Sequence, residues 1–167
     1  MVIDAMTEQE CAALLTRVSL GRLGCSFDDQ PYVVPISFAY EPGYIYALST
    51  LGQKIEWMRQ NPLVCVEVDS VRAQNFWDSV VVFGRYEELT DKPEHELQRR
   101  QAQTVLERRA LWWQTGYAAL QSRGEPKAPA PVFYCIHIDE ISGHKVRPDS
   151  IESSFKSTTS FVRSELQ

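Results

Sequence analysis

The stretch that decides the fold is Gln30-Pro-Tyr-Val-Val-Pro-Ile-Ser-Phe-Ala-Tyr40, followed by the turn Glu41-Pro-Gly43 and by Tyr44-Ile-Tyr-Ala-Leu-Ser-Thr50. In its first half, the even positions carry bulky side chains and the odd positions carry compact ones. Because alternate residues of a strand point to opposite faces, this predicts a β-hairpin whose first strand has a core face and a flat, lightly covered face. Pro31 and Pro35 cannot donate to a sheet ladder, so we expect this strand at an edge or opening.

The end of the hairpin has the composition of an anion-binding site. Two hydroxyl side chains at a strand end precede a glycine, an amide and an ammonium group at the start of a short helix: Ser49, Thr50, Gly52, Gln53 and Lys54. Hydroxyls, free N–H groups of a helix N-terminus and one positive charge together suit a phosphate. Lys54 alone would be interpreted as a solvated surface lysine, but its neighbours favour the phosphate site.

Elements on either side of the hairpin complete a mostly antiparallel pattern. Thr7-Glu8-Gln9-Glu10 is a capping box that opens an amphipathic helix of about three turns. Asn61-Pro62 ends the short helix that begins near Gln53. Gly84 interrupts one of the further strands, and Ser142-Gly143 is predicted to be the turn after the last one. These further strands are expected at residues 23–27, 63–68, 79–89 and 132–141.

A second long helix is expected to form an insertion over residues 91–121, with a Pro-rich link at 124–131. Its apolar stripe comprises Leu106, Ala110, Trp113 and Tyr117. Trp112, Trp113 and Tyr117 are interpreted as core residues, with a partner-binding surface as the alternative. Residues 149–167 are rich in Ser and Thr and are expected to be a disordered tail.

These elements predict an α+β protein, mostly antiparallel β, that forms one domain over residues 1–148. No β-α-β rhythm or glycine-rich nucleotide fingerprint indicates a Rossmann fold, and a KH reading of Gly21 to Gly24 lacks the basic surface that it needs. A barrel of about six strands is filled by its own side chains. A large ligand must therefore bind outside it, on an opened seam or between subunits.

Composition excludes several classes of function. The net charge of −5 argues against a general nucleic-acid binder. No apolar run is long enough to cross a membrane and no secretory signal is recognisable, so a cytoplasmic location is expected. Four cysteines and three histidines show no metal-binding spacing, so we expect no metal, with reduced cysteines mostly in the core. His137, which alternates with Ile136 and Ile138, is interpreted as an ordinary polar residue of a strand.

Several motifs in this order resemble a known family. They are Gly21-Arg-Leu-Gly24, the hairpin, Gly52-Gln-Lys54, Asn61-Pro-Leu-Val-Cys-Val-Glu-Val-Asp69 and Val82-Phe-Gly-Arg-Tyr-Glu-Glu88. Together they resemble the pyridoxamine 5′-phosphate oxidase-like, FMN-binding split-barrel proteins, and within them the branch that holds the nitroimidazole-resistance reductases. The resemblance covers residues 7–90 and 132–145.

The resemblance implies a six-stranded split β-barrel that forms a homodimer, with FMN at the subunit interface. The strand of Val33, Val34, Pro35, Ile36 and Ser37 would lie along the isoalloxazine, and Ser49, Thr50, Gln53 and Lys54 would hold the phosphate. Gln53 stands where many relatives have an arginine. Ser79 matches a polar position that contacts the flavin, and Trp77 would border the same cleft.

The resemblance also implies a flavin-dependent oxidoreductase that reduces a small acceptor with NAD(P)H. The basic carboxy-terminal segment that defines the pyridoxal substrate has no match here, which argues against vitamin B6 oxidation. The sequence nominates no catalytic residue, because the cofactor would carry the chemistry. The alternatives are a non-catalytic flavin-binding or sensor protein, and a relative that binds haem or a deazaflavin. His137 or His144 would then supply the axial ligand to haem.

Overall fold

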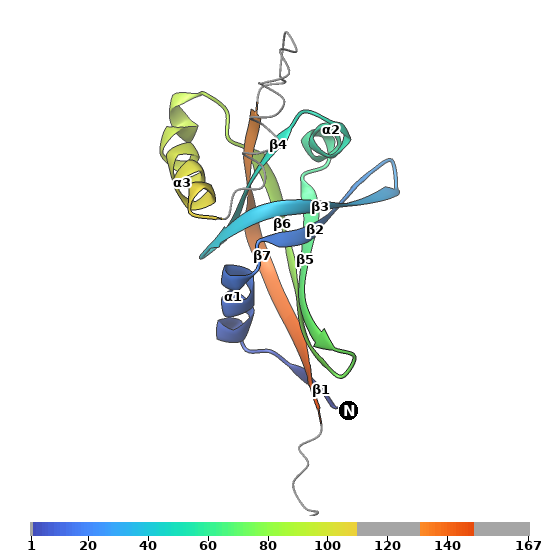
Figure 1. The fold of residues 1–167 in the computed structure, drawn as a ribbon. Coiled ribbons are helices and arrows are strands. Elements are labelled where there is room, and N and C mark those ends of the chain that lie inside the picture. Colours follow the sequence, from blue (N-terminus) through green and yellow to red (C-terminus); the bar gives the residue numbers. More distant parts are fainter. Residues whose placement is uncertain (1, 110–130, 149–167) are drawn as a thin grey trace, which may run out of the picture.

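The computed structural model describes residues 2–109 and 131–148 of the chain (Figure 1). The elements follow the predicted order, with one additional strand at the start. They are β1 (Val2–Ala5), α1 (Glu8–Arg17), β2 (Leu20–Phe27), β3 (Gln30–Glu41), β4 (Tyr44–Thr50), α2 (Gln53–Gln60), β5 (Leu63–Ala73), β6 (Phe76–Glu88), η1 (Pro93–His95), α3 (Glu96–Glu107) and β7 (Pro131–Arg147).

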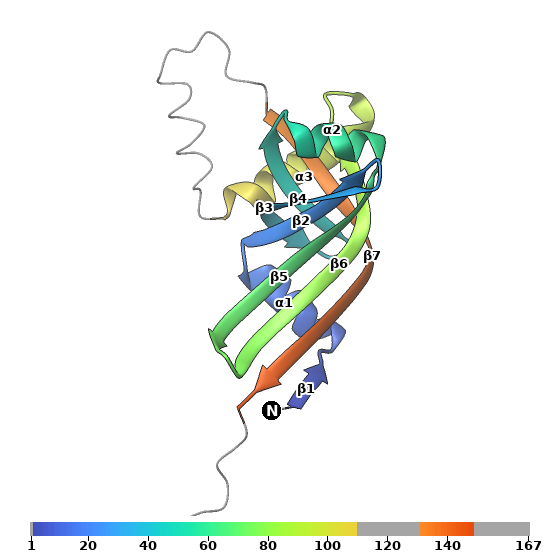
Figure 2. The same ribbon diagram turned by 90° about the vertical axis from the view of Figure 1, so that its right-hand side faces the viewer.

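Six of the seven strands close a ring. They are hydrogen-bonded in the order β7-β4-β3-β2-β5-β6, and β6 pairs with β7 again. Every pairing is antiparallel. The short β1 lies outside this ring, along the far end of β7, where Val2 is opposite Arg147. In Figure 2, β5, β6 and β7 run side by side, with β1 at the lower end of β7. The predicted antiparallel architecture is therefore confirmed.

The local signals at the start of α1 and at the turns on either side of β3 behave as expected. The Thr7 hydroxyl accepts from the Glu10 N–H at 3.2 Å while the Glu10 carboxylate accepts from the Thr7 N–H at 2.9 Å, which completes the capping box. Asp28 and Asp29, with φ of 48° and 60°, form the tight turn between β2 and β3. Gly43, with φ of 86°, forms the turn between β3 and β4.

One predicted turn is wrong. Ser142 and Gly143 do not end the last strand, because β7 continues through them to Arg147 and Gly143 pairs with Val80. A Cβ atom built on Gly143 would lie 2.6 Å from the sulfur of Cys11 on α1. The glycine is thus needed for close approach of the first helix to the strand, not for a change of direction.

Side chains fill the interior of the ring, as predicted for a ring of this size. Its buried cluster includes Leu14 and Leu15 of α1 and Ile55 and Met58 of α2, each no more than 1% exposed. Helix α2 lies at one end of the ring and α1 toward the other (Figures 1 and 2). No space for a large ligand is left inside the part of the ring that the structure describes, so a binding site must lie on its outside.

Helix α3 packs on the outside of the ring and forms a second buried cluster. Ala102, Val105 and Leu106 of α3 lie against Ala39 and Tyr46 of the hairpin. The predicted helical insertion is therefore present as η1 and α3 up to Glu107. The remainder of that prediction, with Trp112, Trp113, Tyr117 and most of the 124–131 link, lies outside the described residues, as does the expected tail.

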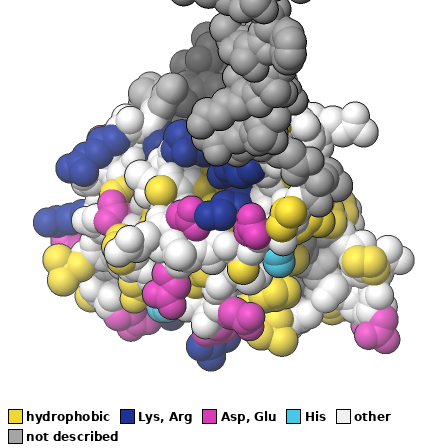
Figure 3. All heavy atoms as spheres, turned by 90° about the horizontal axis from the view of Figure 1, so that it is seen from below, with side chains coloured by type: hydrophobic (Ala, Val, Ile, Leu, Met, Phe, Trp, Pro, Cys, Tyr) yellow, Lys and Arg dark blue, Asp and Glu magenta, His cyan; other side chains and the backbone are white. Residues whose placement is uncertain are grey.

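Charges of both signs meet on the surface. Figure 3, which views the molecule from its β1 end, shows basic and acidic side chains next to one another with hydrophobic side chains between them. Among the described residues, no helix is both long and apolar enough to span a membrane.

Candidate functional site

The strand with the two-faced pattern lines an opening in the ring. The ladder between β3 and β4 starts only at Phe38 and Ala47. Continuing the same register would place Ile36 level with Ser49 and Pro35 level with Thr50, but the strands are not paired there. A proline has no N–H to donate, which explains why the ladder stops before Pro35. Among the described residues, Gln30 to Ile36 therefore have strand partners on β2 only and form the expected edge.

The two faces of β3 differ as the sequence predicted. Ile36 and Phe38 are 5% and 1% exposed and lie in the core, whereas Val33 is 65% exposed. Pro31 and Pro35 are also exposed. The stretch from Pro31 to Pro35 thus offers main-chain groups and low side chains on the outside, a surface on which a planar ring can lie.

The N-terminus of α2 faces the same opening and is not capped by a side chain. Gly52 stands at the N-cap, and nothing lies within 4 Å of a Cβ atom built on it. The first amides that bond within the helix are those of Ile55 and Glu56, which donate to the Gly52 carbonyl at 2.9 and 3.1 Å. The preceding amides of Gln53 and Lys54 therefore belong to the free N–H groups of a helix start, where partial positive charge gathers.

Lys54 adds a full positive charge to this helix start. Its side chain is half-buried and forms no ion pair with any described residue. Burial lowers the pKa of Lys54, and the nearby Cys25 opposes this effect slightly. A partly buried ammonium group without an acidic partner is costly, and an anionic ligand would remove that cost. Ser49 and Thr50 end β4 beside it, with the Ser49 hydroxyl donating to the Thr50 carbonyl at 2.9 Å.

Trp77 and Ser79 lie elsewhere in the same chain. Both are on β6, and the Ser79 hydroxyl donates to Glu67 of β5 at 3.2 Å. Between them and Pro35 lie β2 and β5, which amounts to three strand spacings, or roughly 14 Å. One protomer therefore brings together the residues of β3, β4 and α2 but not those of β6. Arg22, on β2 between the two groups, is paired with Glu67 and Asp69.

A flat row of residues crosses the outside of the ring from β3 to β6. Val33, Gly24, Cys65 and Phe83 are successive partners across β3, β2, β5 and β6. Val33 and Phe83 are 65% and 49% exposed, and between them stand only a glycine and a thiol. A Cβ atom on Gly24 would lie 2.8 Å from the Cys65 sulfur, so the row has no room for a larger residue there.

Comparison with known proteins now identifies the family. The model of the family described as pyridoxamine 5′-phosphate oxidase matches residues 7–145. The chain belongs to this family. An uncharacterized protein of Rhizobium meliloti is 37% identical over 143 residues, which are 86% of this chain and 95% of that protein.

Solved structures agree with this family and its fold. A FAD-binding protein from Mesorhizobium loti is 42% identical, with a TM-score of 0.71 over 89% of this chain and 99% of that one. The FAD-binding protein of Mycobacterium smegmatis is 20% identical, with a TM-score of 0.61 over 86% and 100% of the two chains. A Bacteroides thetaiotaomicron protein assigned to 5-nitroimidazole antibiotic resistance is 17% identical, with a TM-score of 0.61 over 87% and 89%. The last two show the shared fold, and the predicted split barrel is confirmed.

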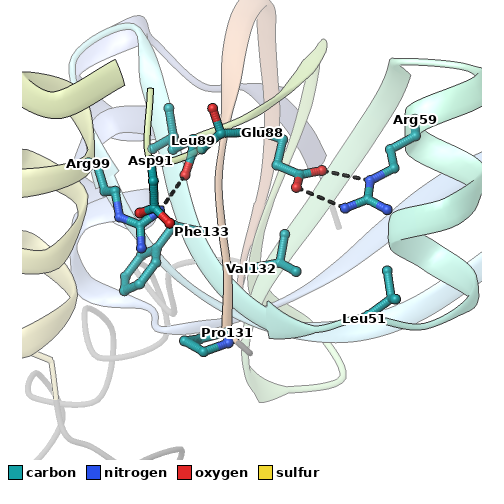
Figure 4. Close-up of a pocket in the computed structure, with 10 residues that line it drawn as sticks. Leu51, Arg59, Glu88, Leu89, Asp91, Arg99, Pro131, Val132 and Phe133 are labelled. Carbon is teal, nitrogen blue, oxygen red and sulfur yellow. Dashed lines mark hydrogen bonds and ion pairs between the residues drawn. The ribbon is translucent and has the colours of Figure 1, made fainter. Parts of the chain in front are cut away.

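This member of the pyridoxamine 5′-phosphate oxidase family also has a pocket of about 530 Å³ between α2 and α3 (Figure 4). Its two arginines are already neutralised. Arg59 donates to both carboxylate oxygens of Glu88 at 2.7 and 2.8 Å, and Arg99 pairs with Asp91 at 2.8 Å. Arg99 also lies over the Phe133 ring, 5.1 Å from its centroid. The pocket is therefore less suited to a phosphate than the start of α2.

This family member also has a second polar cluster that was not predicted from the sequence. Glu87 on β6 meets Cys135 and His137 on β7, although about 50 residues separate the two strands. Cys135 and His137 share one face because they are two positions apart. This spacing could have been noticed, but the approach of Glu87 depends on the strand register. The other expectation for the cysteines is confirmed, since all four are free and Cys11, Cys25 and Cys135 are buried.

Proposed function

We propose that this protein binds a flavin at the opening between β3 and β4 and uses it to reduce a small acceptor with NAD(P)H. The observation that carries the proposal is the half-buried Lys54, which has no ion-pair partner among residues 2–109 and 131–148, at an uncapped helix start beside an exposed strand edge. The Mesorhizobium loti relative, named a FAD-binding protein, supports the flavin as ligand class.

The donors at α2 match one phosphate group. They comprise one ammonium, the free amides of a single helix turn, and the hydroxyls of Ser49 and Thr50. Gln53 contributes an amide and no charge, and the arginines of the neighbouring pocket are held by Glu88 and Asp91. A single monophosphate is what this set neutralises, so we propose FMN as the cofactor. Its ring system would lie along the main chain from Val33 to Ser37.

A second copy of the chain would complete the site. A flavin that lies along β3 cannot reach Trp77 and Ser79 of the same chain, three strand spacings away. The flat row from exposed Val33 on β3 to exposed Phe83 on β6 crosses the same strands and is apolar enough to be covered by a partner. We therefore propose a homodimer that places Trp77 and Ser79 of one protomer near the β3 edge of the other.

In the proposed reaction, the protein need not supply a general acid or a general base. A bound flavin supplies hydride and electron transfer, while the chain supplies placement and electrostatics. Burial raises the pKa of Cys11, Cys25 and Cys135 above the usual range, so these three thiols are poor nucleophiles for another mechanism. In this proposal Lys54 holds the anionic end, and the low side chains of β3 allow close contact with the ring.

The test of this proposal begins with the purified full-length protein. Denaturation should release FMN, identified by chromatography and mass, and the native protein should show a flavin spectrum. FAD in place of FMN would correct the cofactor and keep the flavin site. A colourless protein that also ignores added FMN and FAD would overturn the proposal, and a haem spectrum would replace it with the haem alternative.

Turnover separates the enzyme from a flavin carrier. The flavin-loaded protein is mixed with NADH or NADPH and an electron acceptor such as a quinone or a nitroaromatic compound. Oxidation of the nicotinamide that depends on the acceptor would support the reductase. Bound flavin that is not reduced by either nicotinamide would support the non-catalytic alternative.

Replacing Lys54 tests the position of the phosphate. Lys54→Ala should weaken FMN binding about tenfold or more, because a charge-assisted hydrogen bond contributes roughly 1.5–3 kcal/mol. Fluorescence titration of flavin-stripped protein measures the dissociation constant. Lys92→Ala is the matched control, since Lys92 is exposed and pairs only with Glu94. Equal affinity of the Lys54 variant and the wild type would show that the phosphate binds elsewhere.

A further inference from the structure

Three side chains with metal-binding atoms converge on the outer surface where β6 and β7 run together. Glu87 of β6 is the register partner of Cys135 of β7, and His137 is two positions further along β7 on the same face. One carboxylate oxygen, the thiol sulfur and an imidazole nitrogen all lie within 4.8 Å of one another. None of these residues belongs to the flavin site proposed above.

The contacts within this cluster are already close to those of a coordination shell. His137 Nε2 contacts Glu87 Oε2 directly, and the Cys135 sulfur lies 3.9 Å from the same oxygen. Cys135 is fully buried, whereas the side chains of His137 and Glu87 are 40% and 39% exposed. The cluster thus has a closed inner side at the thiol and an open side toward solvent, where a water molecule can complete the shell.

A second layer of contacts orients the carboxylate. The Thr90 N–H donates to His95 Nδ1 at 3.2 Å, so the proton of the neutral imidazole is on Nε2. That nitrogen lies 3.5 Å from Glu87 Oε1, the oxygen that His137 does not contact. His95 therefore contacts the Glu87 oxygen that faces away from His137 and orients the carboxylate, as residues outside the ligand shell do in metal sites.

The thiol has an outer partner as well. Gln98, on the first turn of α3, donates its Nε2 hydrogen to the Cys135 sulfur at 3.4 Å. Tyr44 of β4 packs edge-on against His137, with ring centroids 5.0 Å apart, and limits the rotation of the imidazole. Each of the three side chains is thus fixed by a neighbour from a different element.

We propose that Glu87, Cys135 and His137 bind a Zn²⁺ ion through one carboxylate oxygen, the thiolate and Nε2, with water as the fourth ligand. Carboxylate, thiolate and imidazole are the three protein ligand types of zinc, and three protein ligands plus one open position form a known type of tetrahedral site. Thiolate and carboxylate together neutralise the two charges of the ion. Coordination deprotonates the thiol outright.

A simple ion pair of His137 with Glu87 would not need this arrangement. It would leave unexplained the buried thiol that faces the same carboxylate and the Gln98 donor aimed at its sulfur. Nor is the thiol placed for nucleophilic chemistry, because it is inaccessible to solvent. A metal ion accounts for all four groups at once.

The experiment uses Co²⁺ as a probe that can replace zinc. Full-length protein is treated with a chelator, desalted and titrated with a Co²⁺ salt. Tetrahedral cobalt gives absorption bands in the red, where oxidised flavin does not absorb. We expect one equivalent per chain, and displacement of the bands by an equal amount of Zn²⁺. Zn²⁺ should also raise the melting temperature, since it binds only the folded chain.

Variants decide the location. His137→Ala and Cys135→Ser should abolish the red bands and the thermal shift, while His144→Ala, an exposed histidine on the same strand, should keep both. His95→Ala leaves all three ligands in place and should weaken binding about 10- to 100-fold. Circular dichroism checks that each variant is folded.

Two results would overturn the proposal. One is a wild-type protein that gives no red bands and no zinc-dependent thermal shift. The other is a tetrahedral cobalt spectrum that persists in the folded His137→Ala variant, which would place the metal elsewhere. If Cys135→Ser does not fold, the His137→Ala and His95→Ala variants still test whether the metal binds at this cluster.

Discussion

Two buried tyrosines, Tyr86 and Tyr134, carry hydroxyl groups with opposite expected effects on the stability of the fold. The rings of Tyr86 and Tyr134 lie 5.4 Å apart. The Tyr86 hydroxyl donates to Glu88 at 3.0 Å, whereas the fully buried Tyr134 hydroxyl has no hydrogen-bond partner among the described residues. Burial raises the pKa of both phenols, so neither ionises at neutral pH. The Tyr134 hydroxyl has lost its hydrogen bonds to water on burial and gains no hydrogen bond within the described part of the protein, so it destabilises the fold.

This difference predicts opposite results for the same substitution. Tyr134→Phe should leave the free energy of unfolding unchanged or raise it, because it removes an unpaired buried hydroxyl. Tyr86→Phe should lower it by about 1 kcal/mol, because a satisfied hydrogen bond is lost. Urea denaturation measures both. A larger loss of stability in Tyr134→Phe than in Tyr86→Phe would show that the Tyr134 hydroxyl has a partner after all.

At the scale of elements, the pair of Arg59 and Glu88 ties α2 to the end of β6 (Figure 4). The hydrogen bond with Arg59 is the main reason that the pKa of Glu88 is below its ordinary value of 4.5. A lowered carboxyl pKa in the folded state stabilises the protein above the pKa of the unfolded chain. That contribution is lost as the pH falls through the folded pKa.

Glu88→Gln should therefore lower stability only where the carboxyl is ionised. At neutral pH we expect a loss of roughly 1 kcal/mol or less, since both side chains are partly exposed. Urea denaturation of the variant and the wild type, at neutral pH and well below pH 4.5, should show that the difference disappears in acid. A constant difference at both pH values would mean that Glu88 acts through packing instead of charge.

The bulge at Asp139 of β7, opposite Phe83 and Gly84 of β6, gives a second prediction for an element. The register between β6 and β7 shifts at Phe83 and Gly84, and a Cβ atom on Gly84 would lie 2.3 Å from the His137 carbonyl oxygen. Gly84→Ala should cost more than about 2 kcal/mol, because backbone must move. Gly143→Ala is the comparison, since the nearest obstacles there are the sulfur atoms of Cys11 and Met6. Thermal melting should rank Gly84→Ala as the more destabilising; the reverse order would contradict the argument.

For the whole molecule, the proposed homodimer depends on the flat row that ends in Phe83. Phe83→Lys should yield a monomer by light scattering and should weaken flavin retention, because charge in an apolar contact opposes association. Leu97→Lys is the matched control, since Leu97 is 82% exposed on α3, away from this row. A Phe83→Lys variant that remains dimeric would exclude this face as the interface.

Much of the fold was predictable because its signals are local. The capping box of α1, the alternation in β3 and the Pro-Gly turn each involve neighbours in the chain. The strand β1 was missed because all four of its residues are exposed and carry no core pattern. It is a strand only because the far end of β7 pairs with it. Gly143 was misread because a glycine for close packing and a glycine for a turn look alike in a sequence.

The candidate flavin site was predictable in part, for a similar reason. Ser49, Thr50, Gln53 and Lys54 are close in sequence, so their proximity needed only a strand end and a helix start. Trp77 and Ser79 were inferred from family resemblance, and the fold shows that one chain does not bring them to β3. The cluster of Glu87, Cys135 and His137 depends on the pairing of distant strands. Pairing of that kind is decided by the packing of the whole ring.

The length of β7 has a consequence for how the chain folds. This 17-residue strand is the common partner of β1, β4 and β6, so the first residues of the protein are joined to almost the last described ones. On the ribosome, β1 must wait until β7 has been synthesised before it can pair, and such long-range pairing should make folding slow. Conversely, Val2 and Arg147 are adjacent, so a circularly permuted chain with these ends fused and a new start at the Asp28–Asp29 turn should retain the architecture.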